Sequence, residues 1–364
     1  MRRTSALIVG GGPAGAVAAL TLARAGAPHL LIERQARTGD ALCGGFLSWR
    51  TLDALARLGI EPAGLGARRV TQVALFASKR CATAPLPRPA GAVSRRRLDT
   101  LLLDHAAHAG ARIERGIGAR TATDTVIRLD DGSEIGADAL FLATGKHELR
   151  GLARPAPPRG ADPTLGLRVR LGPAPALDRL VGDRIELHLF DRGYAGIVLQ
   201  EDGTANCCLV VRRSRLAEAG TPAALLDRLG AKNPQLGARL AYGWSSIDAI
   251  ANIPYGWRAA RSAPGLFRLG DQAAVIPSLA GEGIGIAIAT AAAATRAYLA
   301  GGPDAAVDWQ RFMARRAAHP LRIARILWTL AETPATATAL VRLAALPGLI
   351  QVVAGLTRIG HTPN

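Results

Sequence analysis

The chain has 364 residues, a formal net charge of +17 at pH 7, and 49% hydrophobic residues, of which few are aromatic. This length allows two domains that share a large core, and this hydrophobic content excludes a disordered protein. Scattered basic residues with few aromatic ones argue against nucleic acid as a partner. Because the chain lacks a run of about 18 uncharged apolar residues, no membrane-spanning helix is predicted.

Nearly all of the positive charge is arginine, since Lys79, Lys146 and Lys232 are the only lysines. Together with the many alanines, this excess can reflect the composition of a genome. The functional alternatives are attraction to an anionic membrane surface, to an acidic partner protein or to an anionic substrate.

The four cysteines show neither a Cys-x-x-Cys pair nor the spacing of a zinc site. Cys207 and Cys208 are neighbours whose side chains would point to opposite faces of a strand, so a disulfide framework is not expected. The histidines also lack ligand spacing. We therefore expect a cytoplasmic protein without a metal site.

The N-terminal segment predicts a strand, a turn, a helix and a second strand in that order. Apolar residues 6–9 and 30–32 predict the strands, and residues 16–22 predict the helix, which ends before Gly26. Met1-Arg2-Arg3 imitates the start of a secretory signal, but glycines and a proline interrupt the apolar run after about five residues. The segment is therefore expected to belong to the folded protein.

The turn in this unit has the sequence Gly10-x-Gly12-x-x-Gly15. The first glycine permits a tight turn, the second lets the backbone approach a pyrophosphate, and the third lets the helix pack closely on the sheet. The helix N-terminus offers N–H groups and a positive dipole end to the phosphates. Glu33 follows the second strand, where a carboxylate can accept hydrogen bonds from a ribose. The sequence therefore predicts an adenine dinucleotide site.

Further helices and strands follow up to a proline-rich linker at residues 155–163. The expected elements are a helix at 50–58, a strand at 70–78, a proline-rich crossing at 84–90, a helix at 96–110, a hairpin at 126–135 and a strand at 139–142. This last strand ends in Ala143-Thr144-Gly145. The order predicts a continuation of the α/β domain.

After the linker, the pattern changes to strands separated by short turns. Strands are expected at 165–171, 184–190, 194–200 and 205–211, followed by helix and connection at 215–245. Short turns predict an antiparallel sheet. The chain then returns to a buried strand at Leu266, followed by Gly270-Asp271, the turn Gly281-Glu282-Gly283-Ile284-Gly285 and helices to Asn364.

Three landmarks follow one another along the chain. They are the first strand–helix–strand unit, then Ala143-Thr144-Gly145, and then Gly270-Asp271 before a helix that opens with glycines. They resemble a large FAD-dependent family that includes p-hydroxybenzoate hydroxylase-like monooxygenases, geranylgeranyl reductases and flavin halogenases. The resemblance covers roughly residues 1–300 and implies a Rossmann-type FAD-binding domain, an inserted antiparallel substrate sheet and C-terminal helices, an α/β fold with an α+β second domain. The expected domains are 1–68, 91–160 and 263–300 for FAD, 69–90 and 161–262 for substrate, and 301–364 for the C-terminal helices.

By this resemblance, each landmark supplies part of the FAD site. The residues expected to bind FAD are Gly10, Gly12, Pro13, Ala14, Gly15, Glu33, Arg34, Gly44, Gly45, Arg95, Ala143, Thr144, Gly145, Gly270, Asp271, Gly281, Gly283 and Ile284. Arg95 lies at a helix start that resembles the Arg-x-x-Leu-Asp of the family, although the register can also place Arg96 there. Asp271 would accept hydrogen bonds from ribityl or phosphate-side hydroxyls, and the alternative is a helix cap. The helix that starts near Gly283 would stabilise negative charge on reduced flavin.

The candidates for the substrate side of the flavin are Cys43, Phe46, Tyr194, Pro277 and Ser278. Cys43-Gly44-Gly45 resembles geranylgeranyl reductases more than aromatic hydroxylases, and the alternative role of Cys43 is a small apolar filler. Tyr194 is expected either as a wall of the substrate pocket or as an ordinary sheet residue. Lys146-His147 could bind phosphate or form a solvated loop.

Two reactions follow from the resemblance. The favoured one is hydroxylation of an apolar aromatic or polyketide-like molecule by an FAD-dependent monooxygenase. The second is reduction or dehydrogenation of an isoprenoid, quinone or other lipid-like substrate. The Asp-Gly that serves nicotinamide binding in aromatic hydroxylases is missing after the middle strand, which argues against a dedicated nicotinamide site and favours a separate reductase or electron carrier. The expected reductant is NAD(P)H or a separate electron donor.

The C-terminal segments 321–330 and 340–359 are rich in leucine, isoleucine and valine, with interspersed arginines. Helices of this kind can cover the substrate sheet or a partner, or they can lie on a membrane. We expect packing to dominate, with peripheral membrane contact as the alternative.

Overall fold

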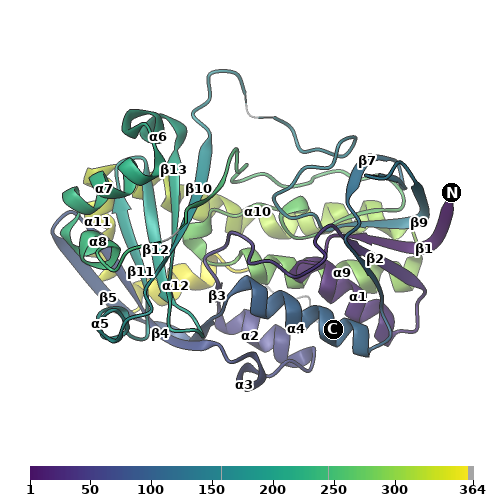
Figure 1. Ribbon diagram of the computed structural model, residues 1–364, viewed down its shortest axis with the longest axis horizontal. Coiled ribbons are helices and arrows are strands. Elements are labelled where there is room, and N and C mark those ends of the chain that lie inside the picture. The colour runs from purple at the N-terminus through teal and green to yellow at the C-terminus, as the bar shows by residue number, and fades with distance from the viewer. Residues whose placement is uncertain (157, 245, 360–364) are drawn as a thin grey trace.

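The computed structural model describes residues 1–156, 158–244 and 246–359. Two β-sheets, one at each end of an elongated molecule, organise the chain into two lobes (Figure 1). Pro157 of the expected linker and the last five residues of the expected C-terminal helices lie outside the described residues.

The first lobe contains a seven-stranded sheet of order β6-β2-β1-β9-β8-β7, with β15 also paired to β9. β1 runs parallel to β2 and β9, and its last four residues are buried, as a strand covered on both faces requires. The strands are β1 (Arg2–Val9), β2 (His29–Glu33), β6 (Arg112–Arg115), β7 (Ala119–Thr123), β8 (Val126–Leu129), β9 (Glu134–Leu142) and β15 (Leu266–Arg268). The expected α/β unit is confirmed, whereas the short, polar strands β6 and β7 were not predicted.

Three helices pack together on one face of this sheet: α1 (Pro13–Arg24), α4 (Arg95–His108) and α9 (Gly283–Gly301). α9 is long and apolar enough to cross a membrane by length and composition, but half of its most apolar stretch is buried. Its Ile286, Ala291 and Ala294 belong to the core cluster that also contains α1. A segment far from α1 in the sequence therefore completes the same layer. The cytoplasmic location stays a prediction.

The second lobe contains an eight-stranded sheet of order β14-β10-β13-β12-β11-β4-β5-β3. Neighbouring strands formed by residues 164–212 pair antiparallel, as expected, whereas β4 lies parallel to β11. The strands are β3 (Phe46–Leu47), β4 (Arg68–Ala77), β5 (Arg80–Ala92), β10 (Thr164–Leu171), β11 (Arg184–Phe190), β12 (Gly193–Leu199), β13 (Ala205–Arg212) and β14 (Asp248–Ile250).

Residues 84–90, expected as a proline-rich crossing, belong to strand β5. β5 is the outer strand over most of its length, because β3 pairs only with Gly91 and Ala92. The carbonyl of Pro85 accepts a hydrogen bond from Gln351, so the backbone polar groups of this residue point away from β4. Proline is tolerated at such positions since its missing N–H removes no bond from the sheet.

The two faces of this sheet have different covers. On β12, Ala195 and Leu199 pack under the helices of one face, while Tyr194 and Gly196 point to the opposite side. The covering helices are α5 (Pro175–Val181), α6 (Arg213–Ala219), α7 (Pro222–Lys232) and α8 (Pro234–Leu240). The opposite side faces α11 (Pro334–Ala344) and α12 (Leu349–Leu356).

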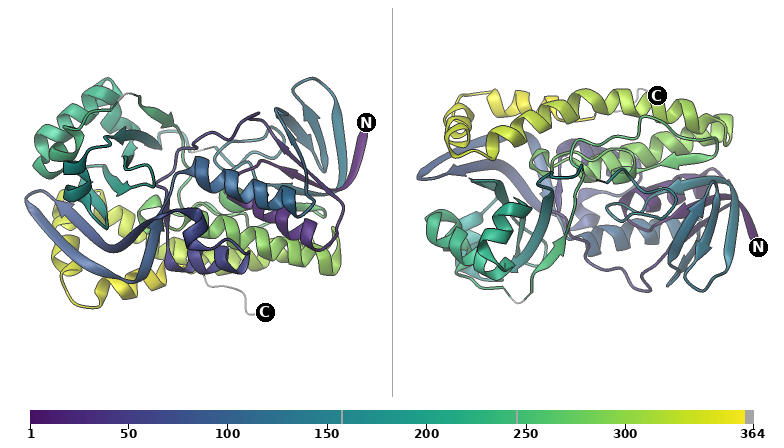
Figure 2. Two further views of the ribbon diagram at one scale, coloured as in Figure 1. Left: turned by 60° about the horizontal axis from the view of Figure 1, so that its bottom comes forward. Right: turned by 90° about the horizontal axis from the view of Figure 1, so that it is seen from above.

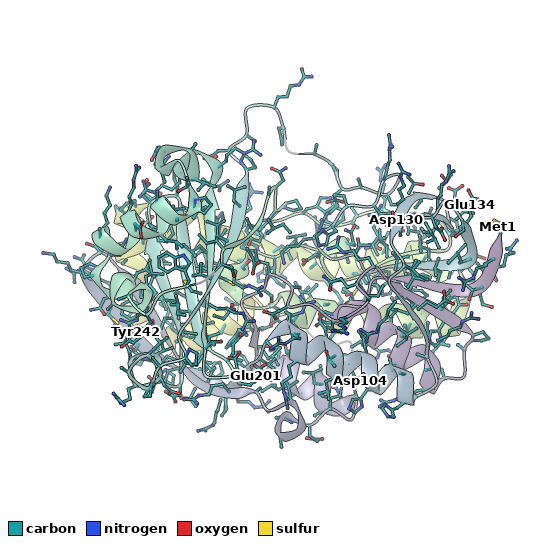
Figure 3. All side chains as sticks on the ribbon, in the orientation of Figure 1. Met1, Asp104, Asp130, Glu134, Glu201 and Tyr242 are labelled. Carbon is teal, nitrogen blue, oxygen red and sulfur yellow. The ribbon has the colours of Figure 1, made fainter. Side chains whose placement is uncertain are left out.

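Segments of both lobes meet at their junction. α10 (Ala305–Ala331) runs along one edge of the molecule past both sheets, and α2 (Trp49–Arg57) and α3 (Pro62–Leu65) lie beside α4 (Figure 2). Glu201, in the turn after β12, accepts hydrogen bonds from the backbone N–H and the hydroxyl of Ser94 at the start of α4. Figure 3 shows Glu201 between the two ends of the molecule, which Met1 and Tyr242 mark.

A buried polar cluster lies on the face of β11 that is covered by helices. Arg239 donates two hydrogen bonds of 2.8 Å to Glu186, and the His188 ring lies 3.1 Å from the same carboxylate and stacks on Phe76. Burial lowers the pKa of His188, although Glu186 opposes this effect. His188 is therefore neutral in the folded protein at neutral pH.

We expect this histidine to make stability depend on pH. Below about pH 6.5 the unfolded chain protonates a histidine that stays neutral when folded, so the free energy of unfolding falls by up to about 1.4 kcal/mol per pH unit. His188→Gln should flatten this slope in urea unfolding measured between pH 5 and 7, whereas His319→Gln on the exposed side of α10 should not. Equal slopes in the wild type and His188→Gln would contradict the assignment.

Candidate functional site

A cavity of about 880 Å³ lies at the junction of the lobes and extends from the glycine-rich turn of α1 to α11 and α12. Almost all of the residues expected to bind FAD or substrate line it. Two expected residues do not line it, Gly15 and Pro277: Gly15 packs against Gly10, and Pro277 is buried behind the cavity wall. The sequence therefore locates one continuous site from segments that are far apart in the chain.

The turn before α1 has the shape that its glycines predict. Gly10 has a φ of +106°, and a Cβ on it would lie 2.6 Å from the carbonyl oxygen of Ala143. A Cβ on Gly15 would lie 1.8 Å from the carbonyl oxygen of Gly10, so no side chain fits there. The N-terminus of α1 consequently presents its free N–H groups to the cavity.

Glu33 at the end of β2 holds this turn in place. Its carboxylate accepts a 2.6 Å hydrogen bond from the N–H of Gly11 and a 2.8 Å bond from that of Gln35. It lies in the cavity wall at the position expected for a ribose acceptor.

Arg95 is the arginine that faces the cavity, and Arg96 is exposed, which decides the register of α4. The Arg95 guanidinium donates bonds of 2.8 and 2.6 Å to Asp99 one turn later and lies 3.2 Å from the position of a Cβ on Gly12. Burial lowers the pKa of Arg95, but the charge of Asp99 and the hydrogen bonds to it together raise the pKa above its ordinary value, so the guanidinium stays charged. A fixed positive charge beside the glycine turn suits a diphosphate.

Asp271 lies in the short turn that follows β15, and its carboxylate is 3.5 Å from the ammonium of Lys146. Burial lowers the pKa of Lys146, but the charge of Asp271 and smaller contributions from Cys43 and Tyr255 together raise it above the ordinary value. Lys146 is thus an ion-pair partner inside the cavity rather than part of a solvated loop. His147 follows it and lies 2.9 Å from the Arg34 guanidinium.

Asp271→Ala is expected to weaken FAD binding by about 1.5–3 kcal/mol, because buried hydroxyl groups would lose a charged acceptor. Fluorescence titration of the apoprotein with FAD measures this loss. Lys146→Met is the informative comparison, since it removes the partner but keeps the carboxylate. Equal losses in both variants would mean that Asp271 acts through Lys146, and unchanged affinity in Asp271→Ala would remove it from the site.

A second glycine turn leads into α9 and forms the middle of the cavity. Gly281 has a φ of +62°, and a Cβ on it would lie 2.9 Å from the ring of Phe46. A Cβ on Gly283 would meet no atom within 4 Å, so the first turn of α9 is open to the cavity. This leaves space for a planar ring against the N-terminus of the helix.

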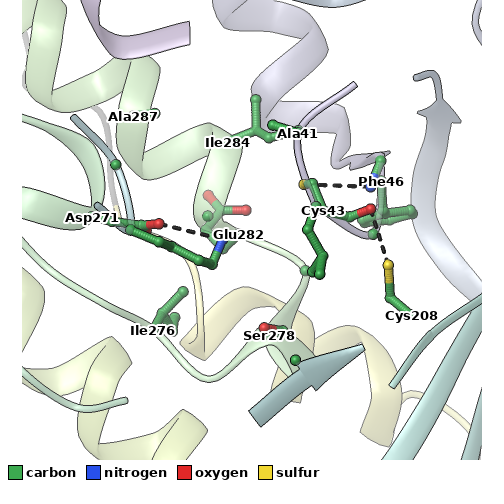
Figure 4. Close-up of a pocket in the computed structure, with 18 of the residues that line it drawn as sticks. Ala41, Cys43, Phe46, Cys208, Asp271, Ile276, Ser278, Glu282, Ile284 and Ala287 are labelled. Carbon is green, nitrogen blue, oxygen red and sulfur yellow. Dashed lines mark hydrogen bonds and ion pairs between the residues drawn. The ribbon is translucent and has the colours of Figure 1, made fainter. Parts of the chain in front are cut away.

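The Cys43-Gly44-Gly45 loop forms the opposite wall of this middle part (Figure 4). Its Cys43 carbonyl accepts hydrogen bonds from the Asn206 amide at 2.9 Å and the Cys208 thiol at 3.1 Å, both from β13. A Cβ on Gly45 would lie 2.7 Å from the carbonyl oxygen of Val93, and its φ is +71°. The loop is therefore fixed between the two lobes.

Three hydroxyl groups gather where the middle part opens toward the second sheet. Tyr255 and Ser278 share a short hydrogen bond, and Tyr194 lies in the adjacent wall. Burial raises the pKa of Tyr255 to about 12, although the hydrogen bond to Ser278 and the charge of Lys146 oppose the rise. Burial also raises the pKa of Tyr194. Both phenols stay protonated at neutral pH.

Beyond these hydroxyls the cavity is lined by aliphatic side chains of β4, β11 and the C-terminal helices. The lining residues from the helices are Leu327, Ala331, Leu340, Leu343, Ala344, Leu349, Ile350, Val353 and Ala354. This half of the cavity therefore suits an apolar chain.

A buried ion pair at the second glycine turn was not expected. The Arg358 guanidinium donates a 2.8 Å bond to Glu282 and a 2.6 Å bond to the carbonyl of Ala280, and it lies over the Trp49 ring. Ser48 also donates to the Glu282 carboxylate. Burial raises the pKa of Glu282, and the charge of Arg358 opposes this rise. No spacing in the sequence links residue 358 to this turn.

Comparisons with known proteins agree with this geometry. Residues 3–150 match the family of FAD binding domains. The chain is an FAD-dependent oxidoreductase. It is 26% identical over 358 residues to a menaquinone reductase of Mycolicibacterium smegmatis, covering 91% of this chain and 85% of that protein.

Two further likenesses extend over most of this oxidoreductase. A digeranylgeranylglycerophospholipid reductase of Methanopyrus kandleri is 27% identical over 296 residues, which cover 76% of this chain and 72% of that protein. A crystal structure of PqsL, a probable FAD-dependent monooxygenase from Pseudomonas aeruginosa, superposes with a TM-score of 0.72 at 17% identity over 93% of this chain and 99% of that one. The last likeness concerns the fold alone.

The cavity fits FAD at each part. Gly10, Gly12 and the N-terminus of α1 would hold the diphosphate with Arg95, and Glu33 would accept the ribose hydroxyls. The open first turn of α9 would face the flavin ring. Among the described residues, no cluster of three or more His, Cys, Asp or Glu side chains could hold a metal ion.

Proposed function

We propose that this oxidoreductase reduces a carbon–carbon double bond in an isoprenoid lipid. The observation that carries the proposal is the aliphatic half of the cavity, which continues directly from the flavin position to α11 and α12. The Cys43-Gly44-Gly45 loop at the flavin position and the two reductases among the relatives support it. An aromatic substrate would leave most of this apolar surface unfilled.

FAD, reduced by NAD(P)H or by a separate electron donor, would supply an electron pair with one hydrogen to one carbon of the double bond. The other carbon needs a proton. Tyr255 carries a protonated phenol in the wall between the flavin position and the aliphatic half, and its bond to Ser278 orients it. We assign Tyr255 as the proton donor and Tyr194 as part of the wall. The π bond is lost, and two C–H bonds form.

Hydroxylation, which the sequence analysis favoured, is the second candidate because the fold superposes on that of PqsL, a probable FAD-dependent monooxygenase. The two reactions differ in their need for oxygen. The FAD-loaded protein can be reduced with dithionite under nitrogen and incubated with menaquinone in detergent. Because dithionite and reduced flavin also convert the quinone ring to the quinol, the product is reoxidised to the quinone in air before its mass is measured. A quinone that stays heavier by two hydrogen atoms supports reduction of the isoprenoid double bond, whereas a product that forms only when the reaction runs in air and gains one oxygen atom supports hydroxylation.

A further inference from the structure

The C-terminal helices expose an unusual share of apolar surface. Among the described residues, eight large hydrophobic side chains are exposed, and four of them fall within residues 343–356. These four are Leu343, Leu346, Val352 and Leu356, with exposed fractions of 48, 53, 58 and 42%. We call them the apolar end face. A soluble surface rarely concentrates such residues without a partner.

The opposite side of the same segment lines the cavity. Leu340, Ala344, Ile350 and Val353 are lining residues, and Leu343 both lines the cavity and is half exposed. One layer of helix therefore separates the aliphatic half of the cavity from the apolar end face. This layer carries apolar side chains on both of its sides.

The charge around this face is one-sided. From Leu321 to Arg358 the chain has four arginines and one carboxylate, Glu332, and one of these arginines, Arg358, is buried against Glu282. The Glu332 carboxylate is engaged by Arg212 through bonds of 2.6 and 2.8 Å. Arg322, Arg325 and Arg342 are exposed on α10 and α11. Such a surface attracts the negative charge of an anionic bilayer.

The geometry favours a segment that lies on a membrane. α11 and α12 together are long and apolar enough to span a bilayer, but they are bent by 114° at their connection. A bent pair with four exposed apolar side chains and the exposed Arg342 suits the interface between headgroups and hydrocarbon. A second protein chain would not by itself require the excess of positive charge.

We propose that the apolar end face docks on an anionic lipid membrane and that the lipid substrate enters the cavity from the bilayer between α11 and α12. The entry route rests on the proposed function, whereas the docking does not. This role goes beyond the reaction, because it assigns the C-terminal helices to the delivery of the substrate.

Vesicle sedimentation of the FAD-loaded protein without substrate tests the docking. The wild type should bind vesicles of phosphatidylcholine with phosphatidylglycerol more strongly than phosphatidylcholine alone, and salt should weaken this binding. Leu346→Glu/Val352→Glu should lower the partition coefficient about tenfold or more. Leu299→Glu/Phe312→Glu is the matched control, since it adds the same charge at exposed apolar residues outside the end face.

Failure of the wild type to bind the anionic vesicles, or equal losses in the two double variants, would overturn the docking. Light scattering identifies the competing occupant: a dimer that Leu346→Glu/Val352→Glu separates would assign the face to a second copy of the chain. Because these measurements need no turnover, docking without reduction of the isoprenoid double bond of menaquinone would refute the proposed function and leave the membrane surface standing.

Discussion

Tyr255→Phe is expected to slow reduction of the lipid about 100-fold or more while FAD stays bound, because the variant loses only the phenolic hydroxyl that would supply the proton. Single-turnover oxidation of the reduced protein by substrate measures this step directly. The phenol must be protonated to act, and burial raises its pKa to about 12. Activity that depends on it should therefore persist above the ordinary tyrosine pKa of about 10.

Tyr194→Phe is the matched control for this experiment. It removes a hydroxyl from the same wall, but its ring packs edge-on against Trp328 at 5.5 Å and would keep the shape of the cavity. If Tyr194 serves only as part of the cavity wall, Tyr194→Phe should change the substrate concentration needed for half-maximal rate more than the maximal rate itself. If Tyr194→Phe loses the rate and Tyr255→Phe keeps it, the two assignments must be exchanged.

Arg358→Met is expected to lower the free energy of unfolding by about 3–5 kcal/mol at pH 8, because it leaves the buried Glu282 carboxylate without its counter-charge. The sign of the pH dependence follows from the raised pKa of Glu282. Its neutral form is tolerated in the core, so the deficit should shrink as the pH falls toward 5. Urea unfolding at several pH values measures both effects.

Two further variants separate the ion pair from packing. Glu282→Gln/Arg358→Met removes both charges and should recover most of the lost stability, since no buried charge remains. Arg342→Met removes an exposed arginine of α11 and should change stability by less than about 0.5 kcal/mol. A pH-independent loss in Arg358→Met, unrelieved in the double variant, would show that the guanidinium acts through its contact with Trp49.

The residues that the sequence placed well are those whose role depends on local backbone shape. Gly10 and Gly281 adopt positive φ and contact backbone or ring atoms that leave no room for a side chain. Such requirements act within a few residues, so they leave a readable pattern in the chain. The same holds for the antiparallel strands between residues 164 and 212, whose short turns decide the pairing direction.

Contacts between distant segments could not be read in this way. Arg358 meets Glu282 because the C-terminal helices fold back to the junction, and nothing near either residue indicates its partner. Tyr255 lies in a loop rich in proline and glycine, and only the pairing of that loop with Ser278 brings its hydroxyl to the cavity. The prolines of β5 suggested a loop because their effect depends on which edge of the sheet they occupy.

That outer strand has a consequence for a protein concentrated on a surface. A long exposed strand is normally a template on which the sheet of another molecule can extend, the first step of aggregation. On β5 the carbonyl of Pro85 is engaged by α12, and Pro87 and Pro89 also lack N–H groups. Neighbouring molecules crowded side by side would therefore find no continuous row of N–H donors on β5. A strand of another molecule would not readily extend the second sheet at this edge.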